Sequence, residues 1–226
     1  KLASIEEILA FLLPQKKIRV IITAGGTIEK LDDVRYLTNI SSGKQALEIA
    51  KSFFGCEVII IKAKTDVEFP LWCQVVMVES AKDMLHAVEN EVGKGCDAFI
   101  SVAAVADFTF NKTTGKVKKA QINKLELIPN PDILQTVASS KNRPKCVVGF
   151  AAESENLLQN TKEKMERKGC NFVIGNELVF GSSATKGVLV GKDIQQEFEC
   201  SKTEIAKKLT CVVFEFLNQS NCKGNG

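Results

Sequence analysis

The sequence contains a single histidine, His86, among its 226 residues. It falls on the polar side of a helix that the apolar spacing predicts over residues 81–92, so we expect an exposed side chain. Enzymes that use a Ser-His-Asp triad or a Cys-His pair need a histidine beside the nucleophile. The sequence therefore argues against both of these enzyme classes.

The eight cysteines include no C-x-x-C pair, and most lie inside hydrophobic runs. Zinc sites usually bring close ligand pairs, often with histidine, so metal binding is the weaker interpretation. We expect buried thiols in a reducing cytoplasm. The cysteines stand at positions 56, 73, 96, 146, 170, 200, 211 and 222.

Long apolar runs and a signal peptide are also missing, so we expect no membrane association. Lysine and arginine exceed the acids by only three, and they are scattered along the chain. This pattern is not that of a protein that binds a nucleic-acid duplex. We expect a cytoplasmic protein with small-molecule partners.

The apolar pattern alternates between short β-rich runs and helical segments from residue 18 onward. This alternation predicts an α/β, Rossmann-like three-layer fold with a mainly parallel sheet, followed by an antiparallel hairpin over residues 187–199. The predicted strands span 18–23, 57–63, 74–79, 97–106, 146–153 and 171–176, and the predicted helices span 43–54, 81–92, 131–139 and 155–168. Ligands of such sheets bind at the carboxyl ends of the strands.

The domain boundaries follow from the ends of this alternation. Residues 1–17 read as a linker or short N-terminal helix, 18–217 as one nucleotide-binding domain, and 218–226 as a disordered tail. The stretch 107–129 reads as irregular, with a short strand over 124–128.

Capping residues indicate where several helices begin. Ser80 with Asp83, and Ser201 with Glu204, form capping-box patterns. Asn130 is the expected cap of the helix that follows it, which would place Pro131 at the first helical position.

The first strand is followed by the polar segment "ITAGGTIEKLDDVRYLTNISSGK". Its Gly25-Gly26 turn lacks the G-x-G-x-x-G spacing of a dinucleotide site, although Lys62 and Lys64 at the end of the second strand would tolerate a 2′-phosphate. An NAD(P)-dependent oxidoreductase is therefore the weaker alternative, and a simple tight turn explains the glycines as well.

Residues Ser41, Ser42 and Gly43 lie where the next helix begins. Free backbone N–H groups and hydroxyls at a helix start can bind an anion, but a serine there can also simply cap the helix. Lys164 and Lys168 share one helix face at i, i+4 spacing, and Lys116 and Lys118 would share one face of an extended segment. Together these groups indicate a polyphosphate ligand.

At this point the segments resemble a known family, the phosphopantothenoylcysteine synthetases of coenzyme A biosynthesis, in their bacterial form. The matching stretches span residues 18–193 in order: "ITAGGTIEKLDDVRYLTNISSGK", "AAVADF", "KVKK", "NPDIL", "VVGFAAE", the helix with Lys164 and Lys168, and "IGNE". Ala46 and Glu177 depart from the usual pattern.

The resemblance implies a ligase that joins 4′-phosphopantothenate to cysteine through an acyl-nucleotidyl intermediate. It implies Mg²⁺, a nucleoside triphosphate for which we favour CTP over ATP, and a homodimer. Residues 1–17 resemble a linker to an upstream phosphopantothenoylcysteine decarboxylase, which alone would carry flavin.

The resemblance also implies residue roles. Asn39, Lys116 and Arg35 are implied for catalysis, whereas Asp32 and Asp33 receive no role. Asn176 matches an asparagine on the substrate side, although it would serve equally well in a turn. We add Gly25, Gly26, Ser41, Ser42 and Gly43 to the substrate side from their own positions, the last three because they lie at a helix start. The nucleotide contacts implied are Ser101, Val102, Ala103, Asp107, Lys116, Pro131, Asp132, Ile133, Leu134, Phe150, Lys164 and Lys168.

A non-catalytic nucleotide-binding domain with the same fold remains the second alternative. The joint presence of Lys116, Asn39 and Asp107 speaks against it, because binding alone would not require the full set.

Overall fold

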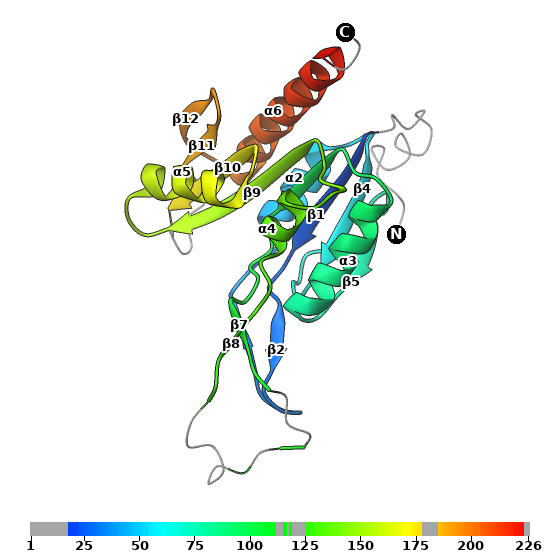
Figure 1. Ribbon diagram of the computed structural model, residues 1–226, viewed down its shortest axis with the longest axis vertical. Helices are drawn as coiled ribbons and strands as arrows, with labels where there is room; N and C mark the ends of the chain where they lie inside the picture. The colour runs from blue at the N-terminus through cyan, green and yellow to red at the C-terminus, as the bar shows by residue number, and fades with distance from the viewer. Residues whose placement is uncertain (1–17, 112–114, 117, 119–124, 178–184, 224–226) are drawn as a thin grey trace.

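The structure is a computed structural model that describes residues 18–111, 115–116, 118, 125–177 and 185–223, with the side chains of 221–223 excepted. Its frame is one eight-stranded sheet in the order β12-β11-β10-β9-β6-β1-β4-β5 (Figure 1). The helix predicted within residues 1–17 lies outside the described residues.

Six neighbouring strands of this sheet are parallel, and β11 and β12 add an antiparallel hairpin at one end. The strands are β1 (Arg19–Ala24), β4 (Glu57–Lys62), β5 (Gln74–Met77), β6 (Ala98–Ser101), β9 (Cys146–Glu153), β10 (Phe172–Glu177), β11 (Thr185–Gly191) and β12 (Gln195–Cys200). The predicted Rossmann-like fold is confirmed. Because β1 leads to β4 on one side and lies beside β6 on the other, the strand order reverses at the centre of the sheet, where ligands of such folds bind.

Helices cover both faces and make the fold three-layered. Helices α2 (Lys44–Ser52) and α6 (Lys202–Lys223) pack together on one face, where Phe53 and Phe214 meet edge to face. Helices α3 (Ala81–Gly93), α4 (Ile133–Ala138) and α5 (Leu157–Lys168) cover the other face. The buried strands carry apolar side chains toward both layers, which is why they read as continuous hydrophobic runs.

A second feature projects from the sheet. Strands β2 (Ile28–Lys30) and β3 (Tyr36–Thr38) form a small antiparallel pair, and β7 (Phe108–Thr109) pairs with β8 (Ile128–Pro129). Figure 1 shows these four strands extending together away from the helical layers. We call them, with the described residues between the paired strands, the arm.

Several sequence-based expectations are corrected by the structure. The strand predicted over 97–106 ends at Ser101, because the N–H groups of Val102 and Ala103 both turn to the Thr23 hydroxyl at 3.1 Å instead of continuing the ladder. The strand predicted over 124–128 is reduced to Ile128 and Pro129, which pair with β7. The β2–β3 pair was not predicted.

The C-terminal helix runs beyond residue 217 to Lys223, so residues 218–223 are helical rather than a disordered tail. The chain from Lys202 to Lys223 contains no glycine or proline, and the hydroxyl of Ser220 donates to the Phe216 carbonyl within the helix. The predicted capping box at its start is confirmed, since the Glu204 carboxylate accepts from the Ser201 N–H at 2.8 Å.

The predicted exposure of His86 is confirmed, but burial of the cysteines is only partly so, because Cys211 is exposed. Burial raises the pKa of the Cys146 thiol to about 12, which keeps it protonated and chemically quiet. None of the described helices is long and apolar enough to span a bilayer.

Candidate functional site

Two clefts open at the carboxyl ends of the parallel strands. The larger, about 1010 Å³, lies on the side of α2 and α6 and includes the first residues of both helices. The smaller, about 310 Å³, lies between the loop after β6, the start of α4, and α5. Ala103, Val105 and Phe150 line both clefts, so the two spaces meet at the centre of the sheet.

The smaller cleft collects almost all of the predicted nucleotide contacts. Its lining includes Ser101, Ala103, Asp107, Pro131, Asp132, Ile133, Leu134, Phe150, Lys164 and Lys168. Val102 faces the larger cleft instead. Arg167 and Asn130 also line the smaller cleft and were not among the predicted contacts; Arg167 was identifiable from its place between two lysines on a helix.

Two lysines of α5 reach across the smaller cleft to different partners. The Lys164 ammonium donates to the Phe150 carbonyl oxygen at 2.6 Å, and the Lys168 ammonium pairs with the Asp132 carboxylate. Burial lowers the pKa of Lys164, and the charge of Lys168 lowers it further, against an opposing effect of Glu153. Lys164 and Lys168 are both half-buried, and an anionic ligand would offset the repulsion between their two ammonium groups.

Asp132, and not Asn130, is the N-cap of α4. Its carboxylate accepts from the Gln135 N–H at 3.0 Å, so Pro131 precedes the helix rather than opening it. Burial alone would raise the pKa of Asp132, but the bonds from Lys168 and from the Gln135 N–H outweigh burial and lower it.

Asn130 instead ties two walls of the smaller cleft together. Its backbone N–H donates to the Asp107 carbonyl at 2.8 Å, and its side-chain N–H donates to the Ala106 carbonyl at 2.9 Å. The capping prediction was wrong because Asn and Asp are both good N-cap residues. The sequence pattern does not distinguish between Asn130 and Asp132 as the cap of α4.

The paired glycines allow three loops to converge beside the clefts. Gly25 has a φ of 82°, and a Cβ on Gly26 would lie only 2.3 Å from the Asn39 carbonyl oxygen. The Gly25 carbonyl accepts from Ala104 at 2.8 Å, and the Gly26 N–H donates to Lys64 at 3.0 Å. Neither glycine lines the two clefts, so their position supports packing of the loops rather than the expected substrate contact.

Asn39 lies beside the point where the clefts meet. Its side-chain N–H donates to the carbonyl oxygen of Val105 at 3.0 Å, and Val105 lines both clefts. Asn176 lines the larger cleft near the end of β10, with its side-chain N–H on the Glu177 carbonyl at 3.3 Å.

The Ser-Ser-Gly segment leads into α2 without a side-chain cap. Gly43 is the N-cap residue with a φ of 69°, and a Cβ there would lie 2.2 Å from the Thr65 hydroxyl oxygen. Ser42 lines the larger cleft, whereas Ser41 and Gly43 do not. The N-cap residue is therefore not a serine, although the exposed Ser42 hydroxyl accepts a long hydrogen bond of 3.4 Å from the Lys44 N–H in the first turn of α2.

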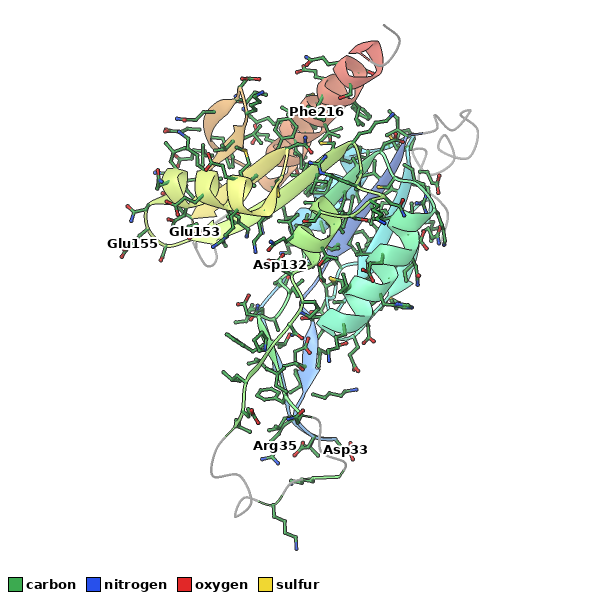
Figure 2. All side chains as sticks on the ribbon, in the orientation of Figure 1. Asp33, Arg35, Asp132, Glu153, Glu155 and Phe216 are labelled. Carbon is green, nitrogen blue, oxygen red and sulfur yellow. The ribbon has the colours of Figure 1, made fainter. Side chains whose placement is uncertain are left out.

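Arg35 and Lys116 lie on the arm, away from both clefts. Arg35 pairs with Asp32, whose carboxylate also accepts from the N–H groups of Val34 and Arg35 at 2.9 and 2.8 Å. Figure 2 shows Arg35 and Asp33 at the far end of the arm and Asp132 beside the sheet. Arg35 and Lys116, both predicted to be catalytic, therefore line neither cleft of their own chain.

Asp32 and Asp33 now have structural roles that the sequence did not reveal. Asp32 is buried and closes the β2–β3 turn, a contact that its Asx-turn spacing to Val34 could have indicated. The Asp33 carboxylate accepts from the Gly115 N–H at 2.9 Å and so fixes the segment that carries the exposed Lys116.

Comparisons with known proteins match most of the chain. The sequence pattern of the DNA/pantothenate metabolism flavoprotein C-terminal domain matches residues 15–216. The Borreliella burgdorferi protein named coenzyme A biosynthesis bifunctional protein CoaBC is 35% identical over 210 residues, which cover 88% of this chain and 53% of that protein. The chain spans about half the length of the curated relatives that it matches.

Two solved structures share the fold. The crystal structure of the C-terminal domain of a CoaBC protein superposes with a TM-score of 0.73 at 33% identity, covering 89% of this chain and 96% of that one. A Cab2 mutant in complex with phosphopantothenate-cysteine has a TM-score of 0.76 at 18% identity, covering 96% of this chain and 92% of that one. The chain belongs to the family of the DNA/pantothenate metabolism flavoprotein C-terminal domain.

Proposed function

We propose that the protein ligates 4′-phosphopantothenate to L-cysteine with a nucleoside triphosphate, as a step of coenzyme A biosynthesis. The observation that carries this proposal is the meeting of two clefts at Ala103, Val105 and Phe150. The smaller cleft is lined by the residues that resemble nucleotide contacts, and the larger cleft is lined by Ser42 and Asn176 among others. The names of the relatives, and the phosphopantothenate-cysteine bound to the Cab2 neighbour, support the same assignment.

In this proposal the nucleotide occupies the smaller cleft and phosphopantothenate the larger one. Lys164 and Lys168 offset the negative charge of the phosphates, and Arg167 adds a third cation along the same wall. The α-phosphate then lies near the shared residues, within reach of a carboxylate that enters from the other cleft. Holding both anions in line is the main task of the protein.

The chemistry proceeds in two displacements. A carboxylate oxygen of 4′-phosphopantothenate forms a bond to the α-phosphorus while the bond to the β-phosphate bridging oxygen breaks, and pyrophosphate leaves. The amine of cysteine then attacks the acyl carbon, loses a proton to solvent, and releases the nucleoside monophosphate. No protein nucleophile is required, which agrees with the position of His86, a residue that lines neither of the two clefts.

Mg²⁺ is proposed as the partner of the triphosphate, and CTP is favoured over ATP from the family resemblance. The carboxylates of Asp107 and Asp132 line the smaller cleft, but Asp132 is engaged by Lys168 and Gln135. No group of three potential metal ligands occurs among the described residues, so phosphate oxygens and water would supply most of the coordination. Bound there, Mg²⁺ would neutralise part of the phosphate charge.

We also propose a homodimer in which the arm of one copy serves the clefts of the other. Apolar side chains stand exposed along the arm: Val34, Tyr36, Leu37, Phe108, Leu125 and Leu127. Such a patch is typical of an interface, and a second copy would bring Arg35 and Lys116 to a site that one chain leaves without them. The 187–199 hairpin is a further proposed contact, and flavin is proposed only if a decarboxylase unit lies upstream of this chain.

The dimer has a specific test in mixed variants. Arg35→Ala on the arm and Lys164→Ala in the cleft should each lose activity alone, whereas a mixture allowed to exchange subunits should regain up to about a quarter of the wild-type rate per site. A mixture that stays inactive, or a monomer by light scattering, would contradict the arrangement.

The activity is tested by supplying 4′-phosphopantothenate, Mg²⁺ and either CTP or ATP, and by measuring pyrophosphate with and without cysteine. We expect cysteine-dependent formation of the nucleoside monophosphate, severely reduced in Lys116→Gln. Folded protein that releases no pyrophosphate with either nucleotide would show the proposal to be wrong. Tight NADPH binding in a fluorescence titration would favour the oxidoreductase alternative, and nucleotide binding without turnover would favour a non-catalytic domain.

A further inference from the structure

The carboxylate of Asp132 uses its two oxygens for two different purposes. Oδ1 accepts from the Gln135 N–H and caps α4, while Oδ2 binds the Lys168 ammonium on α5. One side chain thus connects two helices across the smaller cleft. Both partners of the ion pair line that cleft, and the Lys168 side chain is only 16% exposed.

In the ligand-free cleft, the Lys168 ammonium is already paired with Asp132, although an anionic ligand would need this cation. Lys164, one turn away, donates to the neutral Phe150 carbonyl, so it carries no counter-charge at hydrogen-bond distance there. Without the carboxylate, two ammonium groups on one face of α5 would repel each other inside a partly enclosed space. Asp132 therefore stabilises the ligand-free cleft, but its negative charge faces the place where phosphates would bind.

We propose that Lys168 and Asp132 form a latch, meaning an ion pair that an entering polyphosphate replaces. The Lys168 ammonium leaves the Asp132 carboxylate and pairs with the polyphosphate, while Asp132 Oδ1 keeps its hydrogen bond to the Gln135 N–H at the start of α4. This inference rests on the proposed function, because it assigns the nucleotide to the smaller cleft. Asp132 is here a positioning residue: it holds Lys168 across the cleft before the ligand arrives, and it sets how strongly a polyphosphate binds.

The latch makes an unusual prediction, that loss of a charged residue in the cleft strengthens binding. Asp132→Asn keeps a side-chain oxygen for the α4 cap but has no charge to hold Lys168 or to repel phosphate. Its Kd for CTP, and for inorganic triphosphate as a probe without a base, should fall by about three- to tenfold. Lys168→Gln should weaken binding of both probes.

Two controls separate the latch from a general charge effect. Glu166→Gln removes the same charge from an exposed position of α5 outside the cleft and should leave both Kd values unchanged. In the double variant of Asp132→Asn with Lys168→Gln, most of the gain from Asp132→Asn should disappear, because the partner that it releases is missing. Circular dichroism and thermal melts verify that each variant is folded.

The outcomes are decided by isothermal titration of CTP, ATP and inorganic triphosphate into these variants. Unchanged or weaker CTP binding by folded Asp132→Asn, or an equal gain with and without Lys168, would overturn the latch and leave the ligase proposal intact. If Asp132→Asn binds inorganic triphosphate more tightly than the wild type, as predicted, but the wild type forms no product, the ligase proposal is overturned and the latch stands. Wild-type protein that binds none of the three probes would overturn both.

Discussion

The ammonium of Lys164 donates a hydrogen bond to the backbone carbonyl oxygen of Phe150 at 2.6 Å, which joins α5 to β9 at the point where the two clefts meet. Burial lowers the pKa of this lysine, so its neutral form becomes accessible at a lower pH than in the unfolded chain. An anion bound beside it would favour the charged form again.

Nucleotide binding should therefore take up protons at alkaline pH. Between the lowered pKa of free Lys164 and its ordinary value of about 10.4, the free protein holds less than one proton on this group and the complex holds more. Titration calorimetry in buffers of different ionisation enthalpy measures this uptake. It should decrease markedly in Lys164→Met, and an undiminished uptake in that variant would assign the proton to another group.

The sign of the stability effect follows from the same shift. Below its lowered pKa, Lys164 is charged in the folded and in the unfolded state, and the burial of its charge lowers the unfolding free energy in full. As the pH rises from that pKa toward the pKa in the unfolded chain, the unfolded chain binds more protons than the folded protein, so this cost decreases and the unfolding free energy rises. Lys164→Met should flatten the alkaline part of a plot of unfolding free energy against pH. Lys162→Met, on the same helix but outside the two clefts, is the matched control.

The buried Asp32 should contribute more to stability than its neighbour Asp33. Asp32→Ala removes an acceptor of two backbone N–H groups and the partner of Arg35, and should cost about 1–3 kcal/mol of unfolding free energy. Asp33→Ala, in the same turn but exposed, should cost under about 1 kcal/mol. Urea denaturation measures both, and equal losses would contradict the role given to Asp32.

Asp33→Ala should instead affect catalysis, because it releases the Gly115 N–H and with it the segment before Lys116. We expect a lower kcat with little change in the melting temperature. Asp33→Asn keeps an oxygen acceptor and should retain most of the activity. A drop in kcat that is the same for both variants would argue against positioning through this hydrogen bond.

Gly43 and Gly55 form a pair that separates backbone strain from steric contact. Both have positive φ, at 69° and 85°, but a Cβ on Gly43 would lie 2.2 Å from the Thr65 hydroxyl whereas one on Gly55 meets nothing within 4 Å. Gly55→Ala should cost about 1–2 kcal/mol from strain alone. Gly43→Ala should cost more and also impair substrate binding, since Thr65 Oγ1 holds the Ser42 carbonyl at 2.8 Å; equal costs would show that the loop yields freely.

The sequence was sufficient for features that depend on local periodicity. The apolar runs from Val20 to Ile22 and from Val58 to Ile61 identify buried parallel strands because both faces of the sheet are covered. Capping boxes at Ser80 and Ser201 locate two helix starts by short-range hydrogen bonds. Most of the residues expected from the resemblance to contact a nucleotide line one cleft, because residues that follow parallel strands meet at one edge of the sheet.

Features that depend on contacts between distant segments were not predictable in this way. The strands of the arm are only two or three residues long, too short to show a period in the sequence, and β2 pairs with β3 across a turn that Asp32 closes. The end of β6 is set by the Thr23 hydroxyl, which lies far away in sequence. The distance of Arg35 from the clefts is likewise a property of the arm's direction, which no local pattern encodes.

The most direct measurement of the central claim follows the oxygen atoms of the carboxylate. With 4′-phosphopantothenate labelled with ¹⁸O in its carboxylate, attack on the α-phosphorus and release by cysteine must transfer one labelled oxygen to the nucleoside monophosphate. Mass spectrometry of the CMP formed should therefore show one ¹⁸O per molecule in its phosphate. Unlabelled CMP, formed together with product, would contradict an acyl-nucleotidyl intermediate at the meeting point of the two clefts.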